Sequence, residues 1–345
     1  MDKKFVMGIA AMAALTLVSC SSDDLDSLSD NSSKNEAISF DGYLGRSAVA
    51  VNGTRGSVET KETLKTKGFG VFGKYNAAAG QNFGSDLFDN VKVYSSSTAD
   101  PVTWKYDNTK YWPTEGYINF LAYAPYVDGT KLTGSTIEFT VADKAANQTD
   151  LLWANAKDQT KAKNSGTNKV KFTFNHALSK IGYAVKKGVN DDNVTITLNK
   201  ITLAGSATDP AVGAFYTDGT IDLSKADDAT VLWKNQKGIQ PFTWSTGFPD
   251  VTGSSSASSD YLFVIPQDFS TETELYVIVD YTISYKNGAT ATMKSTVSSQ
   301  IKKNFLQGKA YTINLNIGLT PIEFNAEVND WNPKDGGESI DASWN

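Results

Sequence analysis

The sequence is poor in the residues that most often carry out chemistry. Its 345 residues include one cysteine, Cys20, and one histidine, His176. Zinc sites and cysteine–histidine pairs need more of these side chains than the chain has. The spacings typical of phosphate-binding loops, serine hydrolases and calcium loops are also missing. We therefore predict that the protein is not an enzyme and has no metal site and no cofactor. His176 follows a strand-like run, so we expect it to be structural and bonded to the backbone.

Only the N-terminus has a long apolar run. Residues 5–18 carry no charge and follow Lys3 and Lys4. The run is too short to span a bilayer as a helix, which favours a signal peptide over residues 1–19. Its end, Leu-Val-Ser-Cys at residues 17–20, resembles the lipobox of bacterial lipoproteins, in which the thiol receives a diacylglycerol. We predict lipidation of Cys20 by fatty acids such as palmitate; the alternative is an ordinary signal peptide followed by an incidental cysteine.

The chain that remains from Cys20 is mildly acidic. It has 326 residues, and loss of Asp2, Lys3 and Lys4 leaves 30 basic against 37 acidic residues, a net charge of −7. Nucleic-acid binding requires clustered basic residues, so we predict no nucleic-acid partner. Residues 20–36 are rich in serine and aspartate, which predicts a disordered tether. The length suggests about two domains.

The remaining sequence alternates between strand-like runs and turn residues. Apolar, β-branched and aromatic residues recur at every second position, as in Val170-Lys-Phe-Thr-Phe, and clusters of Gly, Asn, Asp and Ser separate the runs. This pattern predicts an all-β protein with two β-sandwich domains, residues 37–177 and 178–345. Asn287-Gly288 predicts a hairpin turn. Short helical turns are expected at residues 61–67 and 304–307.

Aromatic residues are numerous enough to suggest a sugar-binding surface. The simpler interpretation is that they pack in the core or along strand edges, and we favour it. The candidates for exposed aromatic side chains are Trp104, Tyr111, Trp112, Trp153, Trp233, Trp244 and Trp331.

Arginine is almost absent, and its two occurrences are close together. Thirty lysines are spread through the chain, but the two arginines, Arg46 and Arg55, lie within ten residues of each other. Small residues flank both, as expected of an accessible loop. We predict that Arg55 or, failing that, Arg46 is cut by an arginine-specific protease; the alternative is that the clustering is accidental.

A set of short blocks occurs in order over nearly all of the chain after Cys20. The blocks are Ile38-Ser-Phe, Gly68-Phe-Gly-Val-Phe, Tyr111-Trp-Pro, Phe120-Leu-Ala-Tyr-Ala-Pro-Tyr, Asp150-Leu-Leu, Phe174-Asn-His-Ala-Leu-Ser-Lys-Ile, Ile265-Pro-Gln and Gly308-Lys-Ala-Tyr. This ordered set resembles the fimbrillin family, the Mfa-like lipoprotein pilins of type V fimbriae.

The resemblance implies two tandem transthyretin-like β-sandwich domains after a lipoprotein signal peptide. It also implies a surface-exposed lipoprotein of the outer membrane, held there by its lipid anchor. Removal of the N-terminal strand would be followed by donor-strand exchange with other fimbrial subunits. Residues 322–328 alternate as a donor strand would, but they equally suit the last strand of their own domain. Stalk, anchor and tip roles stay open, as do ligands on host or bacterial surfaces. The alternative function is a monomeric surface lipoprotein that binds glycans through exposed aromatic residues.

Overall fold

The computed structural model describes residues 36–44, 59–80, 85–95, 97, 102–165, 169–226, 232–248, 251–254, 256–257, 260–271, 274–286, 292–318, 323–330 and 338–342. Its contacts separate Met1–Glu36 from one compact unit, Ala37–Asn345, to which all the described strands belong. The predicted signal peptide, nearly all of the predicted tether, Cys20, Arg46, Arg55 and Trp331 lie outside the described residues.

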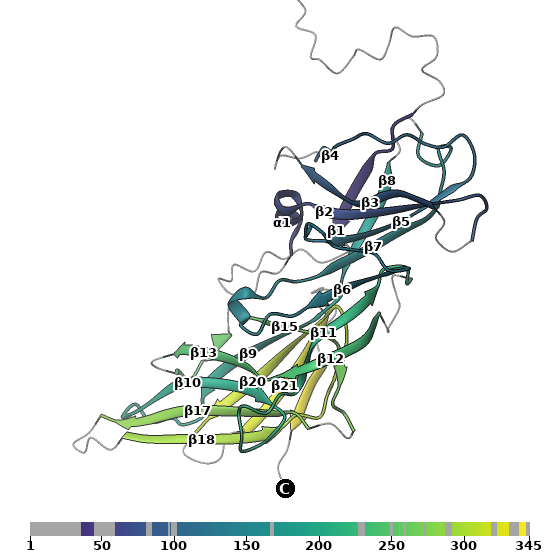
Figure 1. Cartoon of the computed structure of the whole chain (residues 1–345). Coiled ribbons are helices and arrows are strands. Elements are labelled where there is room, and N and C mark those ends of the chain that lie inside the picture. Colours follow the sequence, from purple (N-terminus) through teal and green to yellow (C-terminus); the bar gives the residue numbers. More distant parts are fainter. Residues whose placement is uncertain are drawn as a thin grey trace, which may run out of the picture. The chain divides into compact units, whose positions relative to one another are not determined.

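Strands make up nearly all of the regular structure, which confirms the all-β prediction (Figure 1). The one α-helix among the described residues, α1 (Lys61–Lys67), coincides with one of the two predicted helical turns. Thr60 caps it: the Thr63 N–H donates to Thr60 Oγ1 at 3.2 Å, and the Thr60 N–H donates to Thr63 Oγ1 at 2.6 Å. A single 3₁₀ turn, η1, spans Ala145–Asn147.

The helical turn predicted at residues 304–307 is wrong. Asn304–Phe305 instead form a short strand, β19, paired with β16 (Gln267–Asp268). Phe305 is buried against the rings of Phe215 and Tyr311, so packing of one aromatic side chain decides the local structure.

No helix in the described part of the chain is long and apolar enough to cross a membrane.

The N-terminal half forms a seven-stranded sheet. Its strands, in spatial order, are β1 (Phe40–Leu44), β8 (Val170–His176), β7 (Leu152–Gln159), β5 (Tyr117–Ala124), β2 (Phe69–Asn76), β3 (Ser85–Ser95) and β4 (Trp104–Lys105). β1 pairs with β8 in parallel, and the other neighbours are antiparallel. The two end strands, β1 and β4, also contact each other, so the sheet curls around an apolar cluster.

The seven-stranded sheet contributes to two cores. Along β5, Phe120 and Ala122 belong to the cluster enclosed by the sheet, whereas Leu121 and Tyr123 belong to a larger cluster on the other face. Alternate residues of a strand point to opposite faces, and β5 is buried along almost its whole length. The larger cluster continues into the C-terminal half.

Four further sheets make up the rest of the described structure, and one of them includes a strand of the N-terminal half. A four-stranded sheet has the order β13 (Phe242–Phe248), β10 (Val194–Ala204), β17 (Tyr276–Tyr285) and β18 (Thr292–Gln300). A second sheet contains β14 (Ser256–Ala257), β15 (Leu262–Val264), β9 (Ser179–Lys187), β20 (Lys309–Ile317), β21 (Glu323–Asp330) and β22 (Glu338–Ala342). A three-stranded sheet has the order β12 (Trp233–Gln240), β11 (Phe215–Asp222) and β6 (Thr136–Thr140), and β16 and β19 form the last.

The predicted hairpin is present, since β17 and β18 pair antiparallel; its turn residues, Asn287-Gly288, lie outside the described residues. The segment 323–330, β21, pairs along its length with β20 of its own chain. One N-terminal strand, β6, pairs with β11 from beyond the predicted boundary at residue 177. The division into two tandem domains stays a prediction.

Candidate functional site: the N-terminal strand and the groove that holds it

The first described strand is an edge strand with a buried inner face. Phe40, the first residue of β1, and Ile38, two residues before it, are almost fully buried, whereas Tyr43 of β1 is 48% exposed. Both side chains belong to the apolar cluster that the seven-stranded sheet encloses. The alternation follows from the period of two in an extended chain.

Phe40 fills a pocket made of four aromatic rings. The centroids of Phe88, Phe120, Phe172 and Tyr106 lie 5.3–5.7 Å from that of Phe40, and the Phe88 and Phe120 contacts are edge-to-face. These rings come from β3, β5, β8 and the segment after β4, so one side chain joins both ends of the curled sheet. Burying a phenylalanine of this kind contributes about 1.5–3 kcal/mol, and each aromatic pair adds about 0.5–1.5 kcal/mol.

Main-chain hydrogen bonds hold this segment on two sides. β1 runs parallel to β8 in a register that pairs Phe40 with Val170 and Leu44 with Phe174. Just before β1, the Val170 N–H donates to the Ser39 carbonyl at 2.9 Å, and the Ile38 N–H donates to the Lys110 carbonyl at 2.8 Å. The Tyr106 hydroxyl donates to the Ile38 carbonyl at 2.7 Å. The strand therefore lies in a groove between β8 and residues 106–111.

Gly42 sets the width of this groove. A Cβ atom at this position would lie 3.1 Å from the ring of Phe69 and 3.5 Å from that of Phe174. The first distance is tighter than ordinary carbon contacts, so a methyl group fits at this point only if the ring of Phe69 moves by a few tenths of an ångström. A strand in this groove needs large apolar residues at positions 38 and 40 and a very small one at position 42.

A buried polar cluster holds the chain at Glu59, a few residues beyond Arg55. The Glu59 N–H donates to Asp150 Oδ2 at 3.1 Å, and the same oxygen lies 2.6 Å from His176 Nδ1. Glu59 and Asp150 are almost fully buried. His176 is buried, and its Nδ1 bonds to a carboxylate rather than to the backbone, so the predicted bonding partner is wrong; its structural role stays a prediction. No local pattern signals this pairing, because 26 residues separate the two side chains.

Two lysines complete the cluster. Lys67 forms an ion pair with Glu59, and Lys180 lies with its ammonium 4.5 Å from the ring centroid of Tyr261. Burial raises the pKa of the Glu59 carboxyl, and the bond to Lys67 acts against this. Burial lowers the pKa of Lys180, and the charge of Asp150 acts against that. The cluster ties Glu59 to the start of β7, the end of β8 and the start of β9.

The tryptophans do not form a sugar-binding surface among the described residues. Trp104, Trp112, Trp153, Trp233 and Trp244 are each at most 8% exposed, as the core-packing interpretation expects. Tyr111 is 51% exposed, and Trp331 lies outside the described residues. Within those residues, no group of three or more histidine, cysteine or carboxylate side chains is placed to hold a metal ion.

Comparison with solved structures finds the same fold in proteins of Bacteroides and Parabacteroides species. A fimbrial protein from Bacteroides vulgatus has a TM-score of 0.62 at 22% identity, over 86% of this chain and 99% of that one. A candidate cell adhesion protein from Bacteroides ovatus has a TM-score of 0.52 at 15% identity, over 87% and 99%. One from Parabacteroides distasonis has a TM-score of 0.51 at 8% identity, over 88% and 98%. These identities show the fold alone.

No curated protein matches the sequence. A family model described as fimbrillin-like matches residues 54–331, which is most of the chain. The chain belongs to the fimbrillin-like family.

Proposed function

We propose that this protein is a subunit of a cell-surface fimbria, anchored in the outer membrane by lipid on Cys20. An arginine-specific protease cuts after Arg55 or Arg46, β1 leaves its groove, and a strand from a neighbouring subunit takes its place. The observation that carries the proposal is the position of β1. It is a short edge strand whose inward-facing side chain, Phe40, is buried, and both arginines lie in the stretch that follows it.

Described contacts hold the chain on both sides of the two arginines. Before them, β1 pairs with β8; after them, Glu59 bonds to Asp150 and Lys67. After a cut between residues 45 and 58, β1 is covalently joined only to the lipidated end of the chain, whereas Glu59 stays covalently joined to the body. The covalent link between the strand and the body is lost without any break inside the described sheets.

Loss of β1 would leave apolar surface and main-chain groups in need of a partner. The rings of Phe88, Phe120 and Phe172 would lose the ring that they surround. The outer main-chain groups of β8 and the Lys110 carbonyl would lose their bonds to this segment. An added strand restores both, with main-chain hydrogen bonds for affinity and alternate side chains for register.

The same chain contains a segment with a matching pattern. Residues 38–44 read Ile-Ser-Phe-Asp-Gly-Tyr-Leu, and residues 322–328 read Ile-Glu-Phe-Asn-Ala-Glu-Val. Both have Ile, Phe, a small residue and an aliphatic residue at every second position. Ala326 would place its Cβ where Gly42 has none, so the ring of Phe69 would have to move by a few tenths of an ångström. The pattern supports residues 322–328 of a neighbouring subunit as the incoming strand, which requires that β21 of that subunit first leave its pairing with β20 and β22.

The arginines provide the direct test. An Arg46→Ala, Arg55→Ala variant should reach the cell surface, retain its lipid anchor and fail to polymerise. Lys61→Ala is the matched control, because it removes an exposed basic residue just beyond the stretch. Surface fractions are analysed by N-terminal sequencing and are examined for ladders of polymerised subunits that resist mild denaturation. Normal fimbriae built from the double variant would rule out processing at arginine.

The anchor is tested separately. Cys20→Ala should abolish the incorporation of labelled fatty acid and release the protein from the membrane fraction. Undiminished labelling of this variant would show that the lipid is attached elsewhere, whatever the outcome of the arginine experiment.

A further inference from the structure

β18 forms one edge of the four-stranded sheet. It pairs with β17 over nine consecutive residue pairs, from Gln300 opposite Tyr276 to Thr292 opposite Ser284, without a register shift. Figure 1 shows β18 at the margin of that sheet, and no described strand pairs with its other side. Soluble proteins usually protect such an edge with proline, a bulge, several charges or a very short strand. β18 has no proline and no bulge, and Lys294 is its one charged residue.

The main chain of β18 presents a regular row of groups on the side away from β17. Just beyond the strand, the Ile301 N–H donates to the Leu275 carbonyl at 2.7 Å, and these two residues continue the register of β17 and β18. Because bonded pairs occur at every second position of an antiparallel ladder, the odd-numbered residues of β18 bond to β17. The N–H and C=O groups that point away from β17 therefore belong to Lys294, Thr296, Ser298 and Gln300.

The middle of this edge suits pairing with another strand. Val297 packs against the larger apolar cluster, so Thr296 and Ser298 point to the other face of the sheet. Thr296 Oγ1 donates to Asp280 Oδ1 of β17 at 2.7 Å, which orients the hydroxyl along the sheet. Lys294 and Thr296 are exposed. The centre of β18 is thus accessible and carries residues that fit a strand pair.

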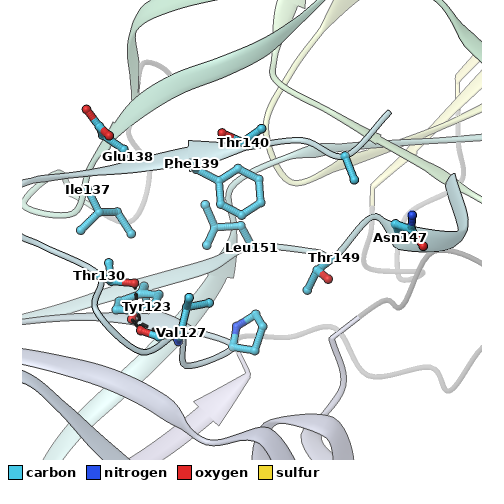
Figure 2. A pocket seen from close by; sticks show the side chains of 12 residues that line it. Tyr123, Val127, Thr130, Ile137, Glu138, Phe139, Thr140, Asn147, Thr149 and Leu151 are labelled. Carbon is cyan, nitrogen blue, oxygen red and sulfur yellow. Dashed lines mark hydrogen bonds between the residues drawn. The ribbon is translucent and has the colours of Figure 1, made fainter. Parts of the chain in front are cut away.

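The edge at β6, by contrast, is closed by its own chain. β6 ends the three-stranded sheet, but a pocket of about 330 Å³ on its far side is walled by other segments. Figure 2 shows Leu151 and Thr149 across from Phe139 of β6. The Tyr123 hydroxyl accepts the Val127 N–H at 3.3 Å, which holds another part of the wall in place. A strand of a second copy has no room to pair there.

The remaining edges of the described sheets are short or irregular. β1 and β22 have five residues each, and β4, β14, β15, β16 and β19 have two or three. β12 has positive φ angles at Asn235 and Gly238, and its register with β11 shifts; the register of β13 with β10 shifts as well. Among the described strands, only β18 of a second copy offers an edge as long and as regular as β18 itself.

We propose that β18 pairs with β18 of a second copy, antiparallel and about a twofold axis at Thr296. This register places Thr296 opposite Thr296 of the second copy and Lys294 opposite Ser298, and it uses the full length of both strands. The outward main-chain groups match, because an even-numbered residue always meets an even-numbered one. The threonine pair is favourable. The two Lys294 residues lie about 14 Å apart along the strands, beyond the screening length of about 8 Å at physiological salt.

The contact is closed, because both copies use the same surface and neither keeps a free β18 edge. It therefore joins two copies side by side and does not lengthen a fimbria. An interface of one strand pair is small, so it binds weakly between free copies. It counts where copies are already held close together, because tethering gives effective concentrations in the millimolar range.

This contact is independent of strand exchange. It needs neither cleavage nor removal of β1, and β18 takes no part in the groove that holds β1. It can therefore fail or succeed whatever the outcome for the proposed function, and uncleaved protein is the material on which to test it.

Single cysteines test the twofold register. In a Cys20→Ala background, the full chain has no other cysteine. Thr296→Cys places the two cysteines at the axis, where the Cα atoms of a bonded pair lie about 5.5 Å apart, within the range of a disulfide. We expect covalent dimers and nothing larger on mild oxidation. Lys294→Cys is the matched control: it is exposed on the same face of the same strand, but about 14 Å from its counterpart, so it should give only background dimers.

Mixing two variants sharpens the test. Ser298→Cys alone should also stay monomeric, but an equal mixture of Lys294→Cys and Ser298→Cys chains should form dimers, because these positions lie opposite each other. Equal dimer yields from Thr296→Cys and Lys294→Cys would overturn the proposal, since random collisions would then explain both. Monomers alone from Thr296→Cys would also overturn it, and would leave this edge to a strand of another protein.

Charges at the axis test the contact without a covalent bond. Thr296→Lys opposes two ammonium groups in the dimer, whereas within one chain the new lysine lies opposite Asp280 and the fold is kept. Self-association of the uncleaved chain, measured by sedimentation at high protein concentration, should weaken about threefold to tenfold. An equal mixture with Thr296→Glu chains should restore it. Ser284→Lys on β17, one strand away from the edge, is the control and should change nothing; a loss as large as that of Thr296→Lys would overturn the proposal.

Discussion

Two edge strands of this protein, β1 and β12, are protected in opposite ways. β1 has five residues, and its inward side chains insert into an aromatic pocket that covers them from both sides. β12 has eight residues, and most of them are exposed; lysines and a bulge limit its pairing with other strands. β1 is therefore held by side chains that fill a pocket. β12 is held by its pairing with β11 and, at its first residue, by buried Trp233, whose Nε1–H donates to the Ala177 carbonyl at 2.8 Å. Removing β1 opens a core, whereas changes in β12 beyond Trp233 alter a surface.

The largest effect should come from emptying the Phe40 pocket. Phe40→Ala removes a ring that contacts four others, and we expect a loss of about 3–5 kcal/mol in the free energy of unfolding. Tyr43→Ala, three residues later on the same strand, should cost less than about 0.5 kcal/mol because Tyr43 is half exposed. Denaturant unfolding of the uncleaved chain measures both. Equal losses would show that the strand is not held by its inner face, and β1 would then resemble β12.

A second large effect should follow from removing Asp150. Asp150→Ala leaves His176 without its Nδ1 partner and Lys180 without the nearby charge that opposes its desolvation. Loss of one member of a buried charged cluster costs about 3 kcal/mol. The variant should also increase hydrogen exchange at the Glu59 amide, which donates to Asp150. Unchanged exchange at that amide would show that the cluster does not hold the chain beyond the arginines.

Asp222 joins the edge strands of the three-stranded sheet and should give a smaller effect that depends on pH. Ser135 Oγ and Ser224 Oγ donate to Asp222 Oδ1 at 2.8 and 2.7 Å, and Lys234 of β12 lies 3.5 Å from Oδ2. Burial alone would raise the pKa of Asp222, but these bonds and the lysine outweigh it, so the pKa is lowered from its usual 3.8.

A folded-state pKa below the unfolded value means that the carboxylate stabilises the fold above about pH 4. That contribution is lost as the pH falls through the lower folded-state value. Asp222→Asn should therefore cost about 1.5–3 kcal/mol at pH 7 and much less at pH 2. Unfolding curves at the two pH values provide the check. A cost that does not change with pH would assign the effect to packing rather than to charge.

Strands with alternating apolar residues can be predicted from the sequence, and strands without them cannot. Ile38-Ser-Phe is recognisable because two large apolar residues flank a small polar one, and the structure buries both. β12, with the sequence Trp-Lys-Asn-Gln-Lys-Gly-Ile-Gln, escapes prediction because an exposed edge strand has no apolar face to show. β22 escapes it for a similar reason, since Glu338–Ala342 contains one large apolar residue.

The groove itself is beyond prediction from the sequence. Its walls come from β3, β5, β8 and residues 106–111, which are far apart in the chain, and the parallel pairing of β1 with β8 has no local signal. The width at Gly42 is likewise decided by Phe69, a residue of another strand. Cys20, Arg46 and Arg55 are predicted from local motifs, and they lie outside the described residues.

The smallest effect should come from Ile239, and a matched substitution on β6 provides the contrast. Threonine keeps the branched Cβ that strands favour, so Ile239→Thr changes polarity with little change in backbone preference. Because Ile239 is 60% exposed, the free energy of unfolding should change by less than about 0.5 kcal/mol. The same change at Ile137, which is 2% exposed on β6, should cost about 2–4 kcal/mol, because it removes buried carbon and introduces a hydroxyl. Denaturant unfolding compares the two variants directly. A cost at Ile239 close to that at Ile137 would mean that Ile239 is covered by the rest of the chain, and the contrast between an exposed and a buried strand residue would then fail.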